Sequence, residues 1–328
     1  MAVAGVMLLF HQLLLLFLLL FLSLFMATAT SSPIMPKPDC PDKCGNITVP
    51  YPFGFGDDAS CYREGFQLLC NHTFTPPKLF LQNTRIWEDT DGDVWYDITY
   101  KVVEVEEISL QGQLRVYSFM NYRCYDDSFV VSHKALNTSL INVDMRDTPF
   151  ALSDTGNILT GIGCGIQADV ASGNASTVSY GLRYGCFSNC SDKNETLNGT
   201  YPGMGYCQTT ITKGLKYFYG ILNGEHEFYR NFSPCAYSFV ADYKWYNFSI
   251  DHLSDFGFYT RNKGMVPTIL DWAIENDSCK NITMRNTTTY ACGNNSGCHD
   301  SHNGLGYLCE CLEGYQGNPY LQDGCQGM

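Results

Sequence analysis

The chain has 328 residues, with 33 Asp and Glu against 20 Lys and Arg, which gives a formal net charge of −13. This acidic balance excludes binding to nucleic acid or to anionic lipid through the overall field of the protein. Sixteen cysteines, an even number, favour a disulfide-rich protein of an oxidising compartment.

The N-terminal segment has the composition of a leader. Its first thirty residues hold no Lys, Arg, Asp or Glu, and residues 13–26 are almost uninterrupted Leu and Phe. With Ala27-Thr28-Ala29 after it, this run predicts a signal peptide over residues 1–29 and a secreted protein, extracellular or in the cell wall. An uncleaved N-terminal anchor, which would keep the protein at the cell-surface membrane, is the alternative. No later apolar run predicts a transmembrane helix.

Cysteines recur along the rest of the chain, and we expect all of them to be bridged. Zinc binding is not predicted, because the chain lacks the CxxC pairs and Cys/His clusters that zinc sites use. Ten cysteines precede the last fifty residues, and their pairing stays open: Cys40, Cys44, Cys61, Cys70, Cys124, Cys164, Cys186, Cys190, Cys207 and Cys235.

Asparagines in the pattern N-x-S/T are far more frequent than chance placement would give. Such sequons are glycosylation acceptors in secreted proteins, so they predict an exposed and heavily glycosylated surface. We exclude Asn189 because the next residue is a cysteine expected to be bridged. The expected sites are Asn46, Asn71, Asn137, Asn174, Asn194, Asn198, Asn231, Asn247, Asn276, Asn281, Asn286 and Asn294.

Short runs of alternating apolar and polar residues dominate the chain after residue 38. This alternation, with Gly, Asn and Asp between the runs, predicts strands. The clearest runs are 102–110, 114–119, 177–182, 217–221 and 236–241. One helix is expected at 267–275, which begins with Pro and is rich in apolar residues. The fold class is therefore mostly β, with disulfide-rich extracellular domains.

The last fifty residues form a block of six cysteines in which Cys309-Glu310-Cys311 precedes Gly314-Tyr315-Gln316-Gly317. Spacing alone leaves fifteen pairings open for six cysteines. The block resembles an EGF-like module over residues 276–328, and that resemblance implies the pairs Cys279 with Cys298, Cys292 with Cys309, and Cys311 with Cys325. The acidic arrangement that calcium-binding modules carry before the first cysteine is lacking. We therefore predict no cofactor and no metal site, and calcium remains an alternative.

The segment CPDKCGNITVPYPFGFG, residues 40–56, is similar to the opening of the galacturonan-binding region of plant wall-associated receptor kinases. GIGC at 161–164, YGCFSNC at 184–190, SPCAYSFVAD at 233–242 and GYQGNPYLQDGC at 314–325 follow in that family's order. The resemblance implies a cysteine-rich galacturonan-binding region over 36–105 and a second β-rich region over 106–275. Two cysteines usual in the family are Tyr201 and Tyr206 here, and the kinase signatures are absent from this sequence.

No motif indicates an enzyme, since neither a nucleophile elbow nor a metalloprotease helix occurs, and the group of Asp251, His252, Ser254 and Asp255 is more typical of a solvated loop. A sugar-acid surface instead needs aromatic faces and cationic donors. Two stretches combine them, and their candidate ligand-binding residues are Lys43, Tyr51, Phe53 and Arg63 in the first and Lys213, Lys216, Tyr217 and Tyr219 in the second. A buried turn at residues 51–54 and a plain amphipathic strand are the alternatives.

The family resemblance implies that the protein recognises pectin, as galacturonan or oligogalacturonides, in the plant cell wall. Because galacturonan is a polyanion and the chain is acidic, binding would require a local basic patch, bridging calcium or a partly esterified polymer. A protein-binding module that acts with a membrane receptor kinase, without sugar binding, is the competing hypothesis. No nucleic-acid partner is expected.

Overall fold

The structure is a computed structural model that describes residues 37–89, 98–124, 137–172, 182–190, 202–224, 226–229, 231–254, 256–285, 289–304 and 306–328. These residues belong to one compact unit, Met35–Met328. The predicted signal peptide lies outside the described residues. Among the residues described, no helix is both long enough and apolar enough to cross a membrane.

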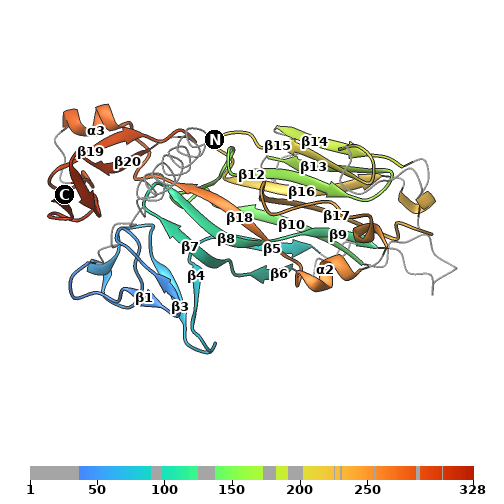
Figure 1. Ribbon diagram of the computed structural model, residues 1–328, viewed down its shortest axis with the longest axis horizontal. Coiled ribbons are helices and arrows are strands. Elements are labelled where there is room, and N and C mark those ends of the chain that lie inside the picture. Colours follow the sequence, from blue (N-terminus) through green and yellow to red (C-terminus); the bar gives the residue numbers. More distant parts are fainter. Residues whose placement is uncertain are drawn as a thin grey trace, which may run out of the picture. The chain divides into compact units, whose positions relative to one another are not determined.

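The described residues form two large antiparallel sheets (Figure 1). The ten-stranded sheet runs in the order β14-β13-β16-β10-β9-β17-β12-β15, with β5 and β6 added beside β10. Its strands are β5 (Arg85–Asp89), β6 (Ile98–Lys101), β9 (Asn121–Cys124), β10 (Asn137–Asp144), β12 (Asn157–Ile162), β13 (Ile166–Ala171), β14 (Arg183–Ser188), β15 (Tyr206–Thr210), β16 (Tyr217–Gly224) and β17 (Cys235–Asp242).

The six-stranded sheet has the order β11-β18-β8-β7-β4-β3. Its strands are β3 (Leu68–Asn71), β4 (Lys78–Leu81), β7 (Glu104–Ser109), β8 (Gln113–Phe119), β11 (Phe150–Leu152) and β18 (Met265–Trp272). Among the described residues before position 276, the remaining elements are short: β1 (Lys43–Cys44) paired with β2 (Ile47–Thr48), helix α2 (Gly257–Arg261), and single helical turns at Ala59–Cys61, His226–Tyr229 and Ile250–Leu253.

The two sheets share a hydrophobic core. Along β8 every second side chain is buried at Leu114 and Val116, and these meet Val143 and Phe218 of the ten-stranded sheet in one cluster. Alternation of this kind leaves one face of a strand for the core and the other for solvent. A mostly β, disulfide-rich fold is thus confirmed, and the sequence patterns at 102–110, 114–119, 217–221 and 236–241 correspond to β7, β8, β16 and β17. The predicted strand at 177–182 lies almost entirely outside the described residues.

The helix predicted at 267–275 is wrong, because this segment forms strand β18. β18 lies between β8 and β11 and packs against β17, where Thr268 Oγ1 donates to the carbonyl of Val240 over 2.9 Å. Both faces are therefore buried, and a doubly buried strand gives a continuous apolar run that periodicity cannot separate from a helix. Pro267 is tolerated because it lies beyond the three residues of β18 that pair with β11.

The boundary expected at residue 105 falls inside β7. Strands β3 and β4, from the first predicted region, share a sheet with β8, β11 and β18, from the second. Sheet formation across this position makes the two predicted regions one folded unit in the structure.

A second core, rich in aromatic rings, packs against strands β9, β12, β15 and β17 of the ten-stranded sheet. It is centred on Tyr237, Phe239 and Phe258. Tyr206, which occupies a position where the family resemblance expects a cysteine, is 9% exposed and belongs to this core. Its ring stacks on Phe248 with centroids 4.5 Å apart. An aromatic contact therefore anchors this position. Tyr201 and most of the loop before Tyr206 lie outside the described residues.

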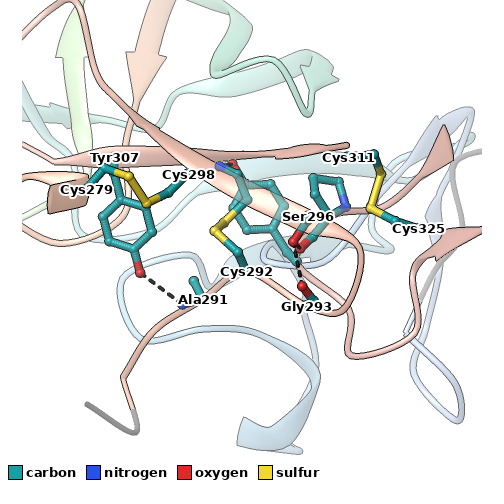
Figure 2. Close-up of a disulfide and its surroundings, with 12 residues drawn as sticks. Cys279, Ala291, Cys292, Gly293, Ser296, Cys298, Tyr307, Cys311 and Cys325 are labelled. Carbon is teal, nitrogen blue, oxygen red and sulfur yellow. Dashed lines mark hydrogen bonds between the residues drawn. A yellow bond between two sulfur atoms is a disulfide. The ribbon is translucent and has the colours of Figure 1, made fainter. Parts of the chain in front are cut away.

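All sixteen cysteines are bridged. The first ten pair as Cys40–Cys61, Cys44–Cys70, Cys124–Cys235, Cys164–Cys190 and Cys186–Cys207. The last six pair as the EGF-like resemblance implies, Cys279–Cys298, Cys292–Cys309 and Cys311–Cys325 (Figure 2). These three bridges hold helix α3 (Cys279–Arg285), hairpin β19 (Ser296–Asp300) with β20 (Tyr307–Cys311), and hairpin β21 (Tyr315–Gly317) with β22 (Cys325–Gly327).

The EGF-like module is joined to the sheets by backbone and side-chain contacts, in a region that we call the junction. Ile274, just after β18, exchanges two backbone hydrogen bonds with Tyr307 of β20, at 2.8 and 3.1 Å. Asn318 is fully buried and donates to the carbonyl of Tyr51 over 2.8 Å, and the Tyr320 ring contacts Trp272. A buried polar group that finds its partner across a boundary fixes the two sides relative to each other.

Candidate functional site

A cavity of about 440 Å³ opens at the junction, within the range usual for sites that bind small molecules. Its wall comes from four segments: the stretch leading into β11, the loop before β16, the end of β18, and the turn between β19 and β20. The lining residues are Arg146, Pro149, Ala151, Gly214, Lys216, Asp271, Trp272, Ala273, Glu275, Asn276, Ser301, Asn303 and Gly304. We call this the junction cavity.

The basic side of the junction cavity is formed by Lys216 and Arg146. Lys216 is half-buried and donates to the carbonyl of Thr148 over 2.7 Å, and burial lowers the pKa of its ammonium group. The Arg146 guanidinium makes a bidentate pair with Asp144 at 2.8 and 2.9 Å and lies 4.6 Å from the centroid of the Tyr217 ring. A partly desolvated ammonium that bonds a neutral carbonyl gains from an anionic ligand.

The acidic groups in the cavity wall already accept hydrogen bonds. Asp271 accepts from Gln113 Nε2 over 3.2 Å and from Asn303 Nδ2 over 2.7 Å. Glu275 forms an ion pair with Arg63 at 2.8 Å. These contacts partly neutralise the carboxylates, so they weaken the repulsion that an incoming carboxylate would meet from this wall.

Of the second predicted set, Lys216 lines the junction cavity and Lys213 is exposed beside Gly214 of its wall. Tyr217 is 8% exposed, and its ring lies 4.6 Å from the Arg146 guanidinium. Tyr219 is half-buried within β16, paired with Asn142 and Ala171 of the neighbouring strands. The structure therefore brings one end of this set to the cavity and leaves Tyr219 in the sheet.

The first predicted set lies in the N-terminal part, where its members have different roles. Lys43 is exposed on β1, and Tyr51 is half-buried with the Lys37 ammonium 4.8 Å from its ring centroid. Phe53 is a core residue rather than a surface one, because it is 1% exposed and packs edge-on against Phe66. Arg63 crosses the junction, where it bonds Glu275 and the carbonyl of Thr289.

Arg146, Asp271 and Asn303 were not identified from the sequence. Each belongs to a different segment, and Asn303 reaches Asp271 across 32 positions of the chain. No pattern of neighbouring residues in the sequence predicts a contact between such distant positions. Asn276 was expected as a glycosylation site, and the structure places it, exposed, in the cavity wall. A glycan at Asn276 would stand at the mouth of the cavity.

Six of the other expected glycosylation sites lie at positions whose exposure the structure describes. Asn46, Asn231, Asn247, Asn281 and Asn294 are exposed, and Asn71 is half-buried. The remainder fall at positions whose surroundings lie outside the described residues. The accessible asparagines are compatible with a glycosylated surface.

The group around His252 caps a turn. His252 Nδ1 accepts from the backbone N–H of Ser249 over 3.2 Å in a capping box at the start of the turn Ile250–Leu253, and Ser254 Oγ donates to the carbonyl of Asp251. His252 also packs its ring on Phe258, with centroids 4.8 Å apart. Asp255 lies outside the described residues. These contacts give His252 a structural role as a neutral acceptor.

We expect the fold to lose stability on acidification through His252. Burial, and then the charge of Arg261, lower the pKa of His252 below the ordinary value of 6.5, and Asp251 only partly opposes them. The unfolded state therefore binds more protons between the folded and unfolded pKa values, and stability falls as the pH drops below about 6.5. In urea unfolding between about pH 7 and pH 5, His252→Gln should lose less stability than the unchanged protein. Identical pH slopes for the two proteins would contradict this assignment.

Comparison with known proteins gives a family context. A family model described as wall-associated receptor kinase galacturonan-binding matches residues 40–87. Wall-associated receptor kinase 2 of Arabidopsis thaliana is 33% identical over 301 residues, covering 89% of this chain and 35% of that protein. Wall-associated receptor kinase 5 of the same plant is 31% identical, with 89% and 35% covered, and wall-associated receptor kinase-like 6 is 25% identical, with 87% and 44% covered.

No solved structure matches the chain. The chain spans about a third of the length of wall-associated receptor kinases 2 and 5. The similarity covers 89% of this chain and so extends far beyond the matched residues 40–87. The chain thus matches the galacturonan-binding family model over residues 40–87 and is similar to wall-associated receptor kinases over most of its own length.

Proposed function

We propose that this chain is a non-catalytic, extracellular polysaccharide-binding protein that recognises pectin, as galacturonan or oligogalacturonides, in the plant cell wall. The observation that carries this proposal is the galacturonan-binding domain matched at residues 40–87. Eight disulfides support an oxidising, extracellular setting.

The charge of the matched domain suits a polyanion better than the charge of the whole chain does. Residues 40–87 contain four Lys and Arg and four Asp and Glu, a balance of 4 − 4 = 0, whereas the whole chain has −13. Lys43 is exposed in this domain. A locally neutral region with accessible cations reduces the repulsion that the mean field would impose on galacturonan.

The junction cavity supplies a second element, a subsite for a single carboxylate. Lys216 and Arg146 line it, and the two acids in its wall, Asp271 and Glu275, accept hydrogen bonds from the protein. A galacturonate carboxylate that bonds Lys216 would replace water around a partly buried ammonium. Because Asn276 carries a sequon at this wall, the cavity suits the end of a short oligomer better than the middle of a long polymer.

Binding to de-esterified polygalacturonate and to short oligogalacturonides tests the proposal. We expect saturable binding that weakens with salt, measured with and without calcium. Lys43→Glu should weaken polymer binding about tenfold, which corresponds to ~1.4 kcal/mol, and Lys216→Gln should weaken oligomer binding to a similar extent. Asn276→Gln, which removes the sequon, separates an effect of the glycan from one of Lys216.

Lys280→Glu is the matched control, because Lys280 is exposed on α3 of the EGF-like module and does not line the cavity. It should bind both ligands as the unchanged protein does. The proposed function fails if a folded, thiol-free protein binds no pectin at any esterification. If all three charge changes weaken binding equally, the effect is one of net charge and neither subsite is supported.

A second candidate function is suggested by exposed apolar side chains on the EGF-like module. Met284 is 70% exposed, Leu312 52% and Met328 82%. Exposed apolar side chains mark a protein-contact surface where they form one contiguous patch, so this candidate requires the three to lie together. Capture of a receptor-kinase ectodomain by a protein that lacks pectin affinity would favour this role over polysaccharide binding.

A further inference from the structure

Three side chains that could bind a metal ion meet beside the junction cavity. They are Asp154, in the turn after β11, Asp271 of β18, and His302, in the turn between β19 and β20. One possible ligand atom from each lies within 4.8 Å of the other two. His302 Nε2 is 3.9 Å from Asp154 Oδ1 and 3.6 Å from Asp271 Oδ2. The sequence predicted no metal site, because these residues are far apart along the chain.

The hydrogen bonding of this cluster is incomplete. The Asp154 side chain is only 10% exposed, and its Oδ1 atom, which faces His302, has no hydrogen-bond partner among the described residues. Burying a carboxylate oxygen without a partner is unfavourable, and a bound cation would supply that partner. The distances from His302 to both carboxylates exceed hydrogen-bond length, so an imidazole proton does not satisfy this oxygen.

Asp271 is held in place for a ligand role. Its side chain is 5% exposed, and Oδ1 and Oδ2 accept from Gln113 and Asn303, at 3.2 and 2.7 Å. A carboxylate oxygen has lone pairs for two partners, so Oδ2 can still bind a cation. Hydrogen bonds to the ligating carboxylate are the outer contacts that protein metal sites use to orient their ligands.

We propose that Asp154, Asp271 and His302 bind one divalent metal ion of the zinc class. Two carboxylate oxygens and one imidazole nitrogen are a donor set for Zn²⁺, whereas Ca²⁺ prefers oxygen ligands alone. Tetrahedral zinc with ligands at about 2.0–2.2 Å places them roughly 3.3–3.6 Å apart, so the spacing to His302 needs only a small contraction. His302 is 53% exposed, which leaves a position open for water.

The ion would link the EGF-like module to two neighbouring segments of the six-stranded sheet at the junction. Asp154 follows β11, the edge strand of the six-stranded sheet, Asp271 lies on the adjacent strand β18, and His302 belongs to the module. Binding to the folded state alone stabilises that state, because the unfolded chain does not bring the three ligands together. This inference does not depend on pectin binding.

Zinc titration of the tag-free, chelator-treated protein tests the proposal by calorimetry, with thermal unfolding as the second readout. We expect one Zn²⁺ per chain and a higher melting temperature with zinc. Asp154→Asn and His302→Gln should each weaken binding at least about tenfold and lose the thermal shift. His299→Gln is the matched control, because His299 is exposed on the neighbouring β19 and should leave both readouts unchanged.

Two results would overturn the site: no zinc binding by the folded protein, or equal zinc affinity in all four proteins. A preference for Ca²⁺ over Zn²⁺ that is lost in Asp154→Asn but kept in His302→Gln would overturn the role of His302. Both variants are to be compared with the unchanged protein by circular dichroism and by thiol titration. If Asp154→Asn fails to fold, His302→Gln alone decides, since its exposed side chain can change without burying a new polar group.

Discussion

Replacing Trp272 by Ala is expected to lower the free energy of unfolding by about 3–5 kcal/mol, one of the largest effects of any single substitution in this chain. Trp272 is 1% exposed, and its ring lies 5.2 Å from Phe53, 5.5 Å from Phe66 and 5.5 Å from Tyr320, measured between centroids. Its indole N–H also donates to the carbonyl of Ser109 over 3.1 Å. The substitution therefore opens a cavity where the N-terminal part, the six-stranded sheet and the EGF-like module meet.

Urea unfolding under non-reducing conditions measures this change. Trp272→Phe is the matched variant, because it keeps a ring in the core and removes the indole N–H, and we expect it to cost roughly 1–3 kcal/mol. Hydrogen exchange gives a local readout, since the amide of Tyr307 that donates to Ile274 should lose protection in Trp272→Ala. A loss below about 1 kcal/mol in Trp272→Ala would contradict the role of this residue as the centre of the junction.

The strands that sequence patterns located are those with one face in the core. In β8, buried Leu114 and Val116 alternate with less buried neighbours, so a period of two is visible in the sequence. β18 is also a strand in a sheet, but both of its faces are buried. Pro267 and Asp271 on one face are buried, as are Val266, Leu270 and Trp272 on the other, so burial does not alternate along this strand. Tertiary packing, which the sequence does not display, decides between helix and strand there.

The disulfide pattern was predictable only where a compact module repeats a known spacing. Bridges of the EGF-like module span 14 to 19 positions and follow from the resemblance. The Cys124–Cys235 bridge spans 111 positions and joins directly opposed residues of β9 and β17. Only the pairing of β9 with β17 brings these two cysteines together, and the spacing of cysteines along the sequence does not predict that pairing.

The candidate site shows the same limit in a sharper form. Lys216 was predicted from a stretch that combines cations with aromatic residues, and the structure places it in the junction cavity. Arg146 and Asn303 were not predicted as site residues, because they belong to other segments that also form the cavity wall. Phe53 was expected at the surface because sugars stack on aromatic rings, yet its ring belongs to the core around Trp272. An aromatic motif does not by itself say which side of the surface its rings occupy.

We expect removal of the Cys124–Cys235 bridge, by the double change Cys124→Ala with Cys235→Ala, to lower the free energy of unfolding by about 4 kcal/mol. The loop that this bridge closes spans 111 positions, so its removal releases the most chain entropy in the unfolded state. Bridges Cys164–Cys190 and Cys186–Cys207 lie inside that loop and shorten its free contour, which keeps the estimate below that for an unbranched loop.

The matched comparison is Cys311→Ala with Cys325→Ala, whose bridge spans 14 positions and should cost about 3 kcal/mol. Denaturant unfolding of both variants, with the remaining bridges verified by thiol titration, gives the difference directly. Loop length acts on the unfolded chain, so the longer loop must show the larger loss if entropy is the source. A larger loss in the EGF-like module would instead mean that its small core depends on the bridge for native packing, as small disulfide-rich domains do.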